Sequence, residues 1–279
     1  MTEIANTESK ASALYVQKGP ATLTEMSGAE VRKALQRTTT ILIPCGATED
    51  HGPHLPLGTD SMEAREICRR TAIALEADGC PVVIGPVIPF GTSSFHMAFA
   101  GTVSISSRTL TQLLHEVCMS LYQGGFRNFI FIHGHDGNLP SMMVAAQEIV
   151  DATRDARSVV LNWLAPLSKV YSTIQTSTKG EGHGGEGETS RLLVTHPELV
   201  HPELGCAYYV PPEQMRKIQG PEHIKTGGPN YYATRSYMDH TPHGHIGDPR
   251  LAKAETGEKG YDTIVAWLTQ VIKRDFFDA

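Results

Sequence analysis

The segment 128–132 (NFIFI) is the feature that most limits how this chain can fold. Four of its five residues are large and apolar, and they follow one another without a polar residue at alternate positions. A strand with one solvated face alternates between polar and apolar residues, whereas a continuous apolar strand is covered on both faces. Parallel sheets that lie between two layers of helices contain such strands. The segment therefore predicts a central, largely parallel β-sheet.

Helical and strand-like segments alternate along the rest of the chain. The clearest helix is 107–123, because Leu110, Leu114 and Leu121 fall on one face and two glycines follow the last turn. We expect strands at 38–46, 81–88, 128–132 and 158–164, and helices at 61–77, 107–123, 140–153, about 188–196 and 255–275. Two prolines make 81–88 a poor central strand.

This alternation predicts a single α/β domain over residues 21–279, preceded by a polar arm at 1–20. The segment 205–250 is rich in Pro, Gly, Tyr and His, and we expect an irregular lid or an oligomer contact there. Trp163 is a candidate pocket residue, but we interpret it as part of the core because buried aromatic side chains more often belong there.

Composition excludes several functional classes. A formal net charge of −6 and the lack of any Lys/Arg run argue against nucleic-acid binding. No apolar stretch approaches the ~18–20 residues that span a bilayer, and the polar, acidic N-terminus is unlike a signal peptide. We therefore expect a cytoplasmic protein with a small-molecule substrate. The five cysteines form no C-x-x-C pair, so neither a disulfide framework nor a thiolate zinc site is predicted.

Ionisable side chains gather directly after the first predicted strand, in the segment 49–60 (EDHGPHLPLGTD). Ligands of open α/β sheets bind beyond the carboxyl ends of the strands. Glu49 and His51 are two residues apart and point the same way in an extended segment, and the glycines and prolines that follow can fold Asp60 back toward them. Carboxylate and imidazole groups bind Zn²⁺, Mn²⁺ or Fe²⁺. Asp60 with Glu63 also matches a helix capping box, but so many ionisable groups together favour a metal site.

A second group, 133–138 (HGHDGN), follows the strand 128–132, and its glycines let the backbone approach a ligand. The alternative is a polar turn in which Asn138 caps the next helix. A third group, 181–190 (EGHGGEGETS), opens a helix. Its carboxylates are candidate metal ligands, and His183 is a candidate acid–base because the pKa of histidine lies near neutrality. The alternative is an acidic loop whose Glu188 favours a helix N-terminus by its charge.

Together the three groups resemble the motifs of the creatininase family, also called creatinine amidohydrolases. The first family motif, roughly E-x-H-G-x-H-L-P-x-x-T-D, is similar to 49–60. The second, G-H-x-x-N, is similar to 134–138, and the third, H-A-G-x-x-E-T-S, to 183–190 with Gly184 in place of Ala. The stretch 91–102 (GTSSFHMAFAGT) resembles G-x-S-x-x-H-x-x-F-P-G-T, and 247–249 and 258–260 resemble another family segment. The matches run in order over most of the chain.

The resemblance implies a single-domain, three-layer α/β sandwich that holds two divalent metal ions (Zn, Mn or Fe) and forms homo-oligomers, often hexamers. Transferred by motif, Glu49, Asp60 and His135 would hold one metal ion. His51 and Asp60 would hold the second ion, so that Asp60 bridges the two.

The second ion needs a further carboxylate. Creatininase itself has a glutamate two residues after the histidine of the second motif, where this chain has Gly137, so creatinine is not the expected substrate. We expect Glu186 to replace that ligand, with Glu188 as its backup or as a catalytic partner. His183 would be the proton shuttle.

The resemblance also places Ser93, His96 and Asp136 at the substrate. Asp136 stands where the family commonly has glycine, and its negative charge favours a neutral or hydroxyl-rich substrate over an anionic phosphate. The expected reaction is attack by a metal-bound hydroxide that opens a small cyclic amide or removes a formyl group. The alternatives are a C–C hydrolase that opens a cyclic β-dicarbonyl such as a keto-inositol, and a non-catalytic metal-binding assembly protein.

Overall fold

Four parallel strands form one sheet in the order β2-β1-β3-β4. Their bounds are Thr40–Cys45 for β1, Val83–Ile84 for β2, Asn128–His133 for β3 and Arg157–Leu161 for β4. A computed structural model describes residues 22–179, 182–214 and 235–278 of the chain. The arm expected at 1–20 and the stretch 215–234 of the expected lid lie outside these residues.

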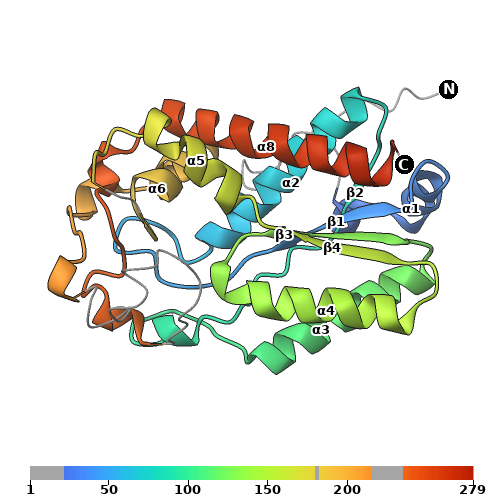
Figure 1. Cartoon of the computed structure of the whole chain (residues 1–279), viewed down its shortest axis with the longest axis horizontal. Coiled ribbons are helices and arrows are strands. Elements are labelled where there is room, and N and C mark those ends of the chain that lie inside the picture. Colours follow the sequence, from blue (N-terminus) through green and yellow to red (C-terminus); the bar gives the residue numbers. More distant parts are fainter. Residues whose placement is uncertain (1–21, 180–181, 215–234, 279) are drawn as a thin grey trace, which may run out of the picture.

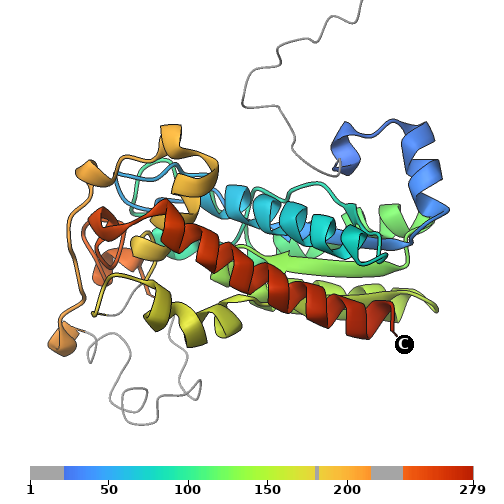
Figure 2. The same ribbon diagram turned by 90° about the horizontal axis from the view of Figure 1, so that it is seen from above.

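Helices cover both faces of the sheet, as Figure 1 shows. One layer contains α3 (Ser107–Gln123) and α4 (Leu139–Ala152). The other contains α2 (Thr59–Ala77) and the long α8 (Ala254–Phe276), with α5 (Leu164–Ile174) and α6 (Glu186–Thr195) beside them. Figure 2 shows α8 running along this layer. The three-layer α/β sandwich with a parallel central sheet is thus confirmed.

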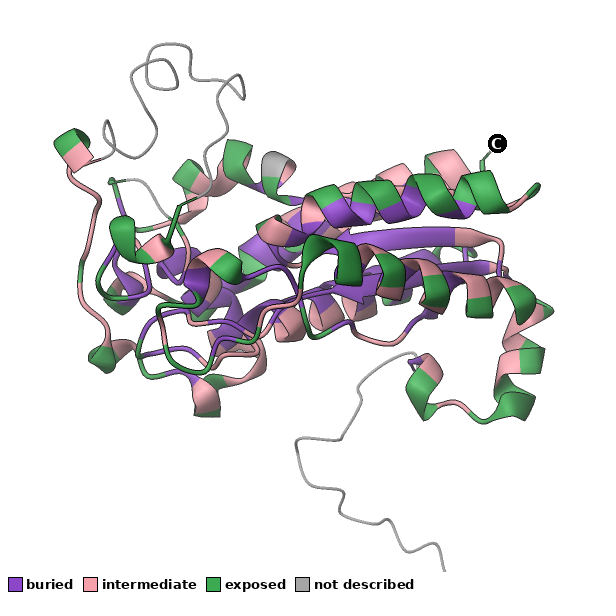
Figure 3. Cartoon of the chain, turned by 90° about the horizontal axis from the view of Figure 1, so that it is seen from below, coloured by how far each residue is buried: buried purple, intermediate pink, exposed green. Residues whose placement is uncertain are grey.

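The central strands β1 and β3 are buried, as the purple ribbon of Figure 3 shows. Successive side chains of each strand enter different cores. Leu42 and Ile130 pack with residues of α2 and α8, whereas Ile41 and Phe129 pack with residues of α3 and α4. All four side chains are fully buried. The continuous apolar pattern of 128–132 therefore reflects one strand that serves two cores.

The register of the two central strands brings distant loops together. Cys45 at the end of β1 pairs with His133 at the end of β3. The chain leaves β1 through α2 on one face, while α3 leads into β3 from the other face. Strand ends at such a switch point leave a crevice for a ligand. The loops after β1 and β3 therefore meet at one edge of the sheet, at the left of Figure 1.

Two helices were not expected. The strand predicted at 158–164 ends at Leu161, and α5 begins at Leu164 with Pro166 in its first turn, where proline is compatible with a helix. Near the N-terminus, α1 (Gly28–Leu35) begins with a capping box between Ser27 and Glu30. The strand predicted at 81–88 shortens to the two residues of β2 at the sheet edge. Within the described part of the chain, no helix is long and apolar enough to span a membrane.

Candidate metal centre

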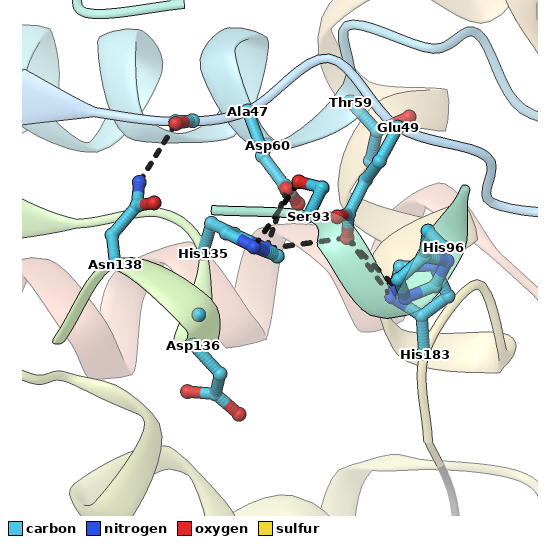
Figure 4. Close-up of polar contacts among 12 residues, drawn as sticks. Ala47, Glu49, Thr59, Asp60, Ser93, His96, His135, Asp136, Asn138 and His183 are labelled. Carbon is cyan, nitrogen blue, oxygen red and sulfur yellow. Dashed lines mark hydrogen bonds and ion pairs between the residues drawn. The ribbon is translucent and has the colours of Figure 1, made fainter. Parts of the chain in front are cut away.

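Four segments at the carboxyl edge of the sheet supply the ionisable side chains. Glu49 and His51 lie in the loop after β1, Asp60 in the first turn of α2, and His135 directly after β3. Glu188 belongs to the first turn of α6. Figure 4 shows Glu49, Asp60 and His135 pointing toward one another from these separate elements. The three sequence groups therefore form one cluster.

The cluster contains two triads that share Asp60. In the first triad, Nδ1 of His135 lies 3.2 Å from Oε1 of Glu49 and 3.2 Å from Oδ2 of Asp60. In the second triad, Nε2 of His51 lies 3.0 Å from Oδ1 of Asp60 and 3.9 Å from Oε2 of Glu188. Within each triad one ligand atom per residue lies within 4.8 Å of the others. Each triad can hold one cation, with Asp60 between the two.

Backbone carbonyls orient both histidines. Nδ1–H of His51 donates to the carbonyl of Glu49 at 3.0 Å, and Nε2–H of His135 donates to the carbonyl of Thr92 at 3.2 Å. Each ring therefore turns its other nitrogen toward Asp60. Metal-ligating histidines typically have one nitrogen fixed in this way. Oε2 of Glu49 is buried with no hydrogen-bond partner among the described residues, as expected for an atom that would bind an ion. The residues fit a divalent metal.

The four central groups shift one another's protonation. Burial opposes charge on His51, but the Asp60 carboxylate outweighs it and raises the pKa of His51 to about 10. Burial and the Asp60 charge raise the pKa of Glu49, yet His135 and its hydrogen bond lower it to about 2. The pKa of Asp60 is held well below its usual range by His51 and His135 despite burial, and that of His135 is raised by Glu49. The carboxylates therefore remain ionised.

His183 completes the cluster from the loop before α6. Its Nε2–H donates to the carbonyl of Asp50 at 2.7 Å, so Nδ1 faces inward, 3.7 Å from Oε1 of Glu49. Its ring stacks on His51 with centroids 4.1 Å apart. Glu49, His51 and His183 form a third candidate triad, but it has one carboxylate and borrows a residue from each of the other two. His183 is also more exposed than His51, which suits a proton-transferring group.

Loop 182–185 is fixed against the loop after β1. Gly184 has a φ of +64°, and a β-carbon there would lie 2.5 Å from the carbonyl oxygen of His51. Its carbonyl accepts a hydrogen bond from Nε2 of His54 at 2.7 Å, and its N–H donates to Oε2 of Glu188 at 2.5 Å. The close approach explains glycine at this position, and it places Glu188 beside His51.

A cavity of about 580 Å³ opens onto the cluster. The ligands Glu49, Asp60, His135 and Glu188 line one side. The remaining walls come from loops, from the end of β3 and from α5 and α6: Phe95, His96, His133, Gly134, Asp136, Trp163, Leu164, Leu167, Ser168, Tyr171, Ser172, Gln175, Gly182, His183, Gly187, Arg191 and Tyr237. A cavity of this size accommodates a small molecule or the end of a peptide.

Comparison with known proteins gives the family. The family model described as creatinine amidohydrolase matches residues 24–272. The chain belongs to the creatininase family. The mycofactocin precursor peptide peptidase of Mycolicibacterium smegmatis is 31% identical over 236 residues, which cover 84% of each protein. The 3-dehydro-scyllo-inosose hydrolase of Thermotoga maritima is 24% identical over 263 residues, 89% of this chain and 81% of that one. A solved structure of creatininase with manganese superposes with a TM-score of 0.77 at 21% identity, covering 92% and 99%.

Membership of this family of hydrolases makes the chain an enzyme. The structure places the expected ligands Glu49, His51, Asp60 and His135 together, but it does not place Glu186 with them. The Glu186 carboxylate instead accepts hydrogen bonds from the N–H groups of Thr176 and Ser177, at 2.5 and 2.7 Å. It is buried and holds the segment after α5. Glu188, which was expected as the backup, lies in the candidate triad with His51 and Asp60.

The three residues that were expected to contact the substrate differ in their position relative to the cavity. His96 lines it, 3.8 Å from Oε1 of Glu49, and stacks on Tyr237 with ring centroids 4.2 Å apart. Burial, aided by nearby His183, lowers the pKa of His96 to about 3, so its ring is neutral. Asp136 also lines the cavity. Ser93 does not, because its buried hydroxyl lies 3.4 Å from Nε2 of His135, across that ring from the carboxylates.

The structure confirms Trp163 as a core residue and adds it to the cavity wall, together with residues that the sequence did not single out. Trp163, interpreted as core, is buried but also lines the cavity. Tyr237 belongs to the segment expected to form a lid, and Phe95 stands beside His96 in the family stretch, so both had a local signal. Arg191 had none, because its position depends on a buried ion pair with a residue of another helix.

Proposed function

We propose that this enzyme is a divalent-metal-dependent hydrolase that cleaves an amide C–N bond in a small cyclic amide, a formyl amide or a peptide-like substrate. The observation that carries the proposal is the pair of carboxylate–imidazole triads that share Asp60 at the floor of a substrate-sized cavity. Bound ions there would polarise a carbonyl and lower the pKa of water toward neutrality. Oxygen and nitrogen ligands suit Zn, Mn or Fe, and manganese is present in the creatininase structure.

The ligands divide between two ions as follows. Glu49, Asp60 and His135 would hold the first, and His51, Asp60 and Glu188 the second. Support comes from the 3.0–3.2 Å approach of both imidazoles to Asp60 and from the burial of every one of these residues except Glu188, whose side chain is 22% exposed. An exposed ligand beside the cavity leaves room for substrate on that side of the second triad.

His183 would hold and pass the proton that the leaving group needs. Its Nε2–H is committed to the Asp50 carbonyl, so the exchange takes place at Nδ1, which faces Glu49. His96 has a different part, because a neutral imidazole orients a substrate by hydrogen bonding without adding charge. Tyr237 packs on both rings and shields them from water. Proton transfer by a positioned histidine contributes about 10²–10⁴-fold to a rate.

A second candidate is cleavage of a C–C bond in a cyclic β-dicarbonyl compound such as a keto-inositol. The relative from Thermotoga maritima, a 3-dehydro-scyllo-inosose hydrolase, matches 89% of this chain and so favours it. The same ligands and the same proton donor would serve, because an attacked ketone also needs a polarised carbonyl. The two reactions differ in their products. An amide releases an amine, a formamide releases formate as well, and a dicarbonyl releases neither.

Metal content is the first test. Purified wild type should hold about two ions per chain, as two-metal hydrolases do. Asp60→Asn should hold one or none, while the exposed substitution Asp78→Asn should leave the content unchanged. A hydrolysis panel of cyclic amides, formamides, peptides and β-diketones, assayed for amine and formate, then separates the candidates. His183→Ala should keep its metals and lose about 10²–10⁴-fold in turnover.

Two results would contradict the proposal. Equal metal content in wild type and Asp60→Asn would show that Asp60 is not a ligand shared by two ions. A protein with full metal content that released no product from any substrate class would favour a non-catalytic assembly protein. The cytoplasmic location stays a prediction that cell fractionation would check. The hexameric assembly implied by the resemblance stays a prediction that sedimentation would check.

A further inference from the structure

We propose that Asp136 binds a positively charged group of the substrate, so that the enzyme prefers amides that carry an ammonium or guanidinium group beside an apolar part. The inference rests on the proposed function, because it takes the cluster as the place where the amide is cleaved. It concerns a residue that is next to a ligand in sequence but is not a ligand itself.

Asp136 lies in the short turn Asp136–Asn138 directly after His135. Figure 4 shows its carboxylate pointing away from Glu49 and His135. It still lines the same cavity as those two residues, and 67% of its side chain is exposed. A substrate can therefore place one group beside Asp136, in the open part of the cavity, and its amide at the cluster.

The carboxylate is held in place without losing its charge. Its Oδ1 accepts a hydrogen bond from Nε2–H of buried His133 at 2.8 Å. This hydrogen bond orients the Asp136 carboxylate from one of its two oxygens. None of the described residues hydrogen-bonds to Oδ2 of Asp136 or forms a Lys or Arg ion pair with it. One oxygen therefore stays available to a partner from solvent.

Apart from the proposed metal ions, the described lining residues offer no free lysine or arginine that could cancel the charge of Asp136. Among the described lining residues, Arg191 is the one Lys or Arg side chain. Its guanidinium is buried and pairs with both oxygens of Glu63, at 3.0 Å each. The lining carboxylates of Glu49, Asp60 and Glu188 face the metal triads, so Asp136 is the carboxylate left for the substrate. At Asp136 a cationic group of the substrate is therefore matched, whereas a phosphate or carboxylate placed beside it is repelled.

The same part of the cavity offers an apolar surface. Leu164 at the start of α5 is 38% exposed although it is apolar, and Leu167 and Trp163 line the cavity near it. The Trp163 ring lies edge-on to His133, the residue that holds Asp136, with centroids 5.7 Å apart. An apolar surface near a carboxylate with one free oxygen suits an aromatic or aliphatic amine better than a sugar-like molecule.

Matched metal chelators test this charge preference without relying on turnover. The probes are 4-(aminomethyl)benzohydroxamate, which is cationic, and 4-(hydroxymethyl)benzohydroxamate, which is neutral and of nearly the same shape. Calorimetric titration of metal-loaded wild type should show about tenfold tighter binding of the cationic probe, the size of effect given by one charged hydrogen bond. Asp136→Asn should bind the two equally, and Asp136→Glu should restore part of the preference. Asp262→Asn, an exposed substitution on α8, is the control and should behave as wild type.

Two kinds of result would contradict the inference about Asp136. Equal binding of the two probes by wild type, or an unchanged preference in Asp136→Asn, would overturn this inference and leave the proposed function standing. Binding of neither probe by a protein that holds its metals would overturn both, because the triads would then be closed to a ligand.

Discussion

Loading the metal-free enzyme with ions should release about two protons per chain near pH 7. The structural reason is that both central histidines have acceptors at both nitrogens. His51 faces the carbonyl of Glu49 and the carboxylate of Asp60, at 3.0 Å each. His135 faces the carbonyl of Thr92 and, at 3.2 Å, the carboxylates of Glu49 and Asp60. A ring in such a position is an imidazolium, and its inner proton occupies the place of an ion.

The magnitude follows from the pKa values. The pKa of His51 is raised from 6.5 to about 10, and that of His135 is also raised well above its ordinary value. At about pH 7 both rings are almost fully protonated, and an ion that takes one inner nitrogen expels one proton. Apparent affinity at His51 should therefore rise about tenfold for each pH unit between pH ~7 and ~9, and the raised pKa of His135 adds to this rise.

The same shifts give the metal-free enzyme a pH-dependent stability. A raised histidine pKa stabilises the fold most below 6.5, the ordinary value for the unfolded chain, and this contribution is lost as pH rises through about 10. We expect the midpoint of thermal unfolding of the metal-free enzyme to fall between pH ~7 and ~9. The metal-loaded enzyme should not show this fall, because its imidazoles carry no inner proton.

Calorimetric titration with Mn²⁺ in buffers of different ionisation enthalpy counts the released protons. His196→Gln is a suitable control, because burial lowers the pKa of His196 and it lies outside the cluster. It should release the same number as wild type. Release of fewer than about half a proton while two ions bind would refute the reasoning. The imidazoles would then be neutral without metal, and the carboxylates would have to be stabilised in another way.

Further substitutions test other parts of the site. Glu188→Gln should weaken binding of the second ion. Glu186→Gln should keep both ions and lower the free energy of unfolding by about 1–3 kcal/mol, since it loses one of the two oxygens that accept from the N–H groups of Thr176 and buried Ser177. Metal analysis and urea unfolding separate these outcomes, and the reverse pattern would restore Glu186 as the expected ligand. Arg191→Met should cost about 3–5 kcal/mol because it leaves buried Glu63 unpaired, and the double substitution with Glu63→Leu should recover much of that loss in the same assay.

The sheet and the first triad were predictable because they depend on local pattern and strand order. An apolar strand followed at once by His-Gly-His places His135 at the carboxyl edge, whatever the rest of the fold does. The loop after β1 ends at the same edge because parallel strands have one direction. α5 was not predictable in this way. Its proline and β-branched residues weaken the helical pattern, and its place depends on packing against α8.

The choice between Glu186 and Glu188 shows what sequence cannot decide. Two residues apart in an α-helix, these side chains point in nearly opposite directions, about 200° apart. Which one faces the metals depends on the rotation of α6. The buried ion pair between Arg191 and Glu63 of α2 helps to fix that rotation. With this pair formed, the side of α6 that carries Gly187, Glu188 and Arg191 lines the cavity. Only the tertiary contact decides the ligand.

The residues proposed to hold metals differ in their surroundings from those proposed to select a substrate. Glu49, Asp60 and His135 of the first triad are buried at the sheet edge, and His135 also donates to the carbonyl of Thr92, so a substitution there would disturb the fold and the chemistry together. Asp136 and Leu164 are exposed in the cavity and bind no part of the cluster. A change at these two positions can alter which molecule fits without altering the metals. Relatives in this family carry names for action on a precursor peptide, on creatinine or on an inosose, as expected when function depends on the site rather than on the fold.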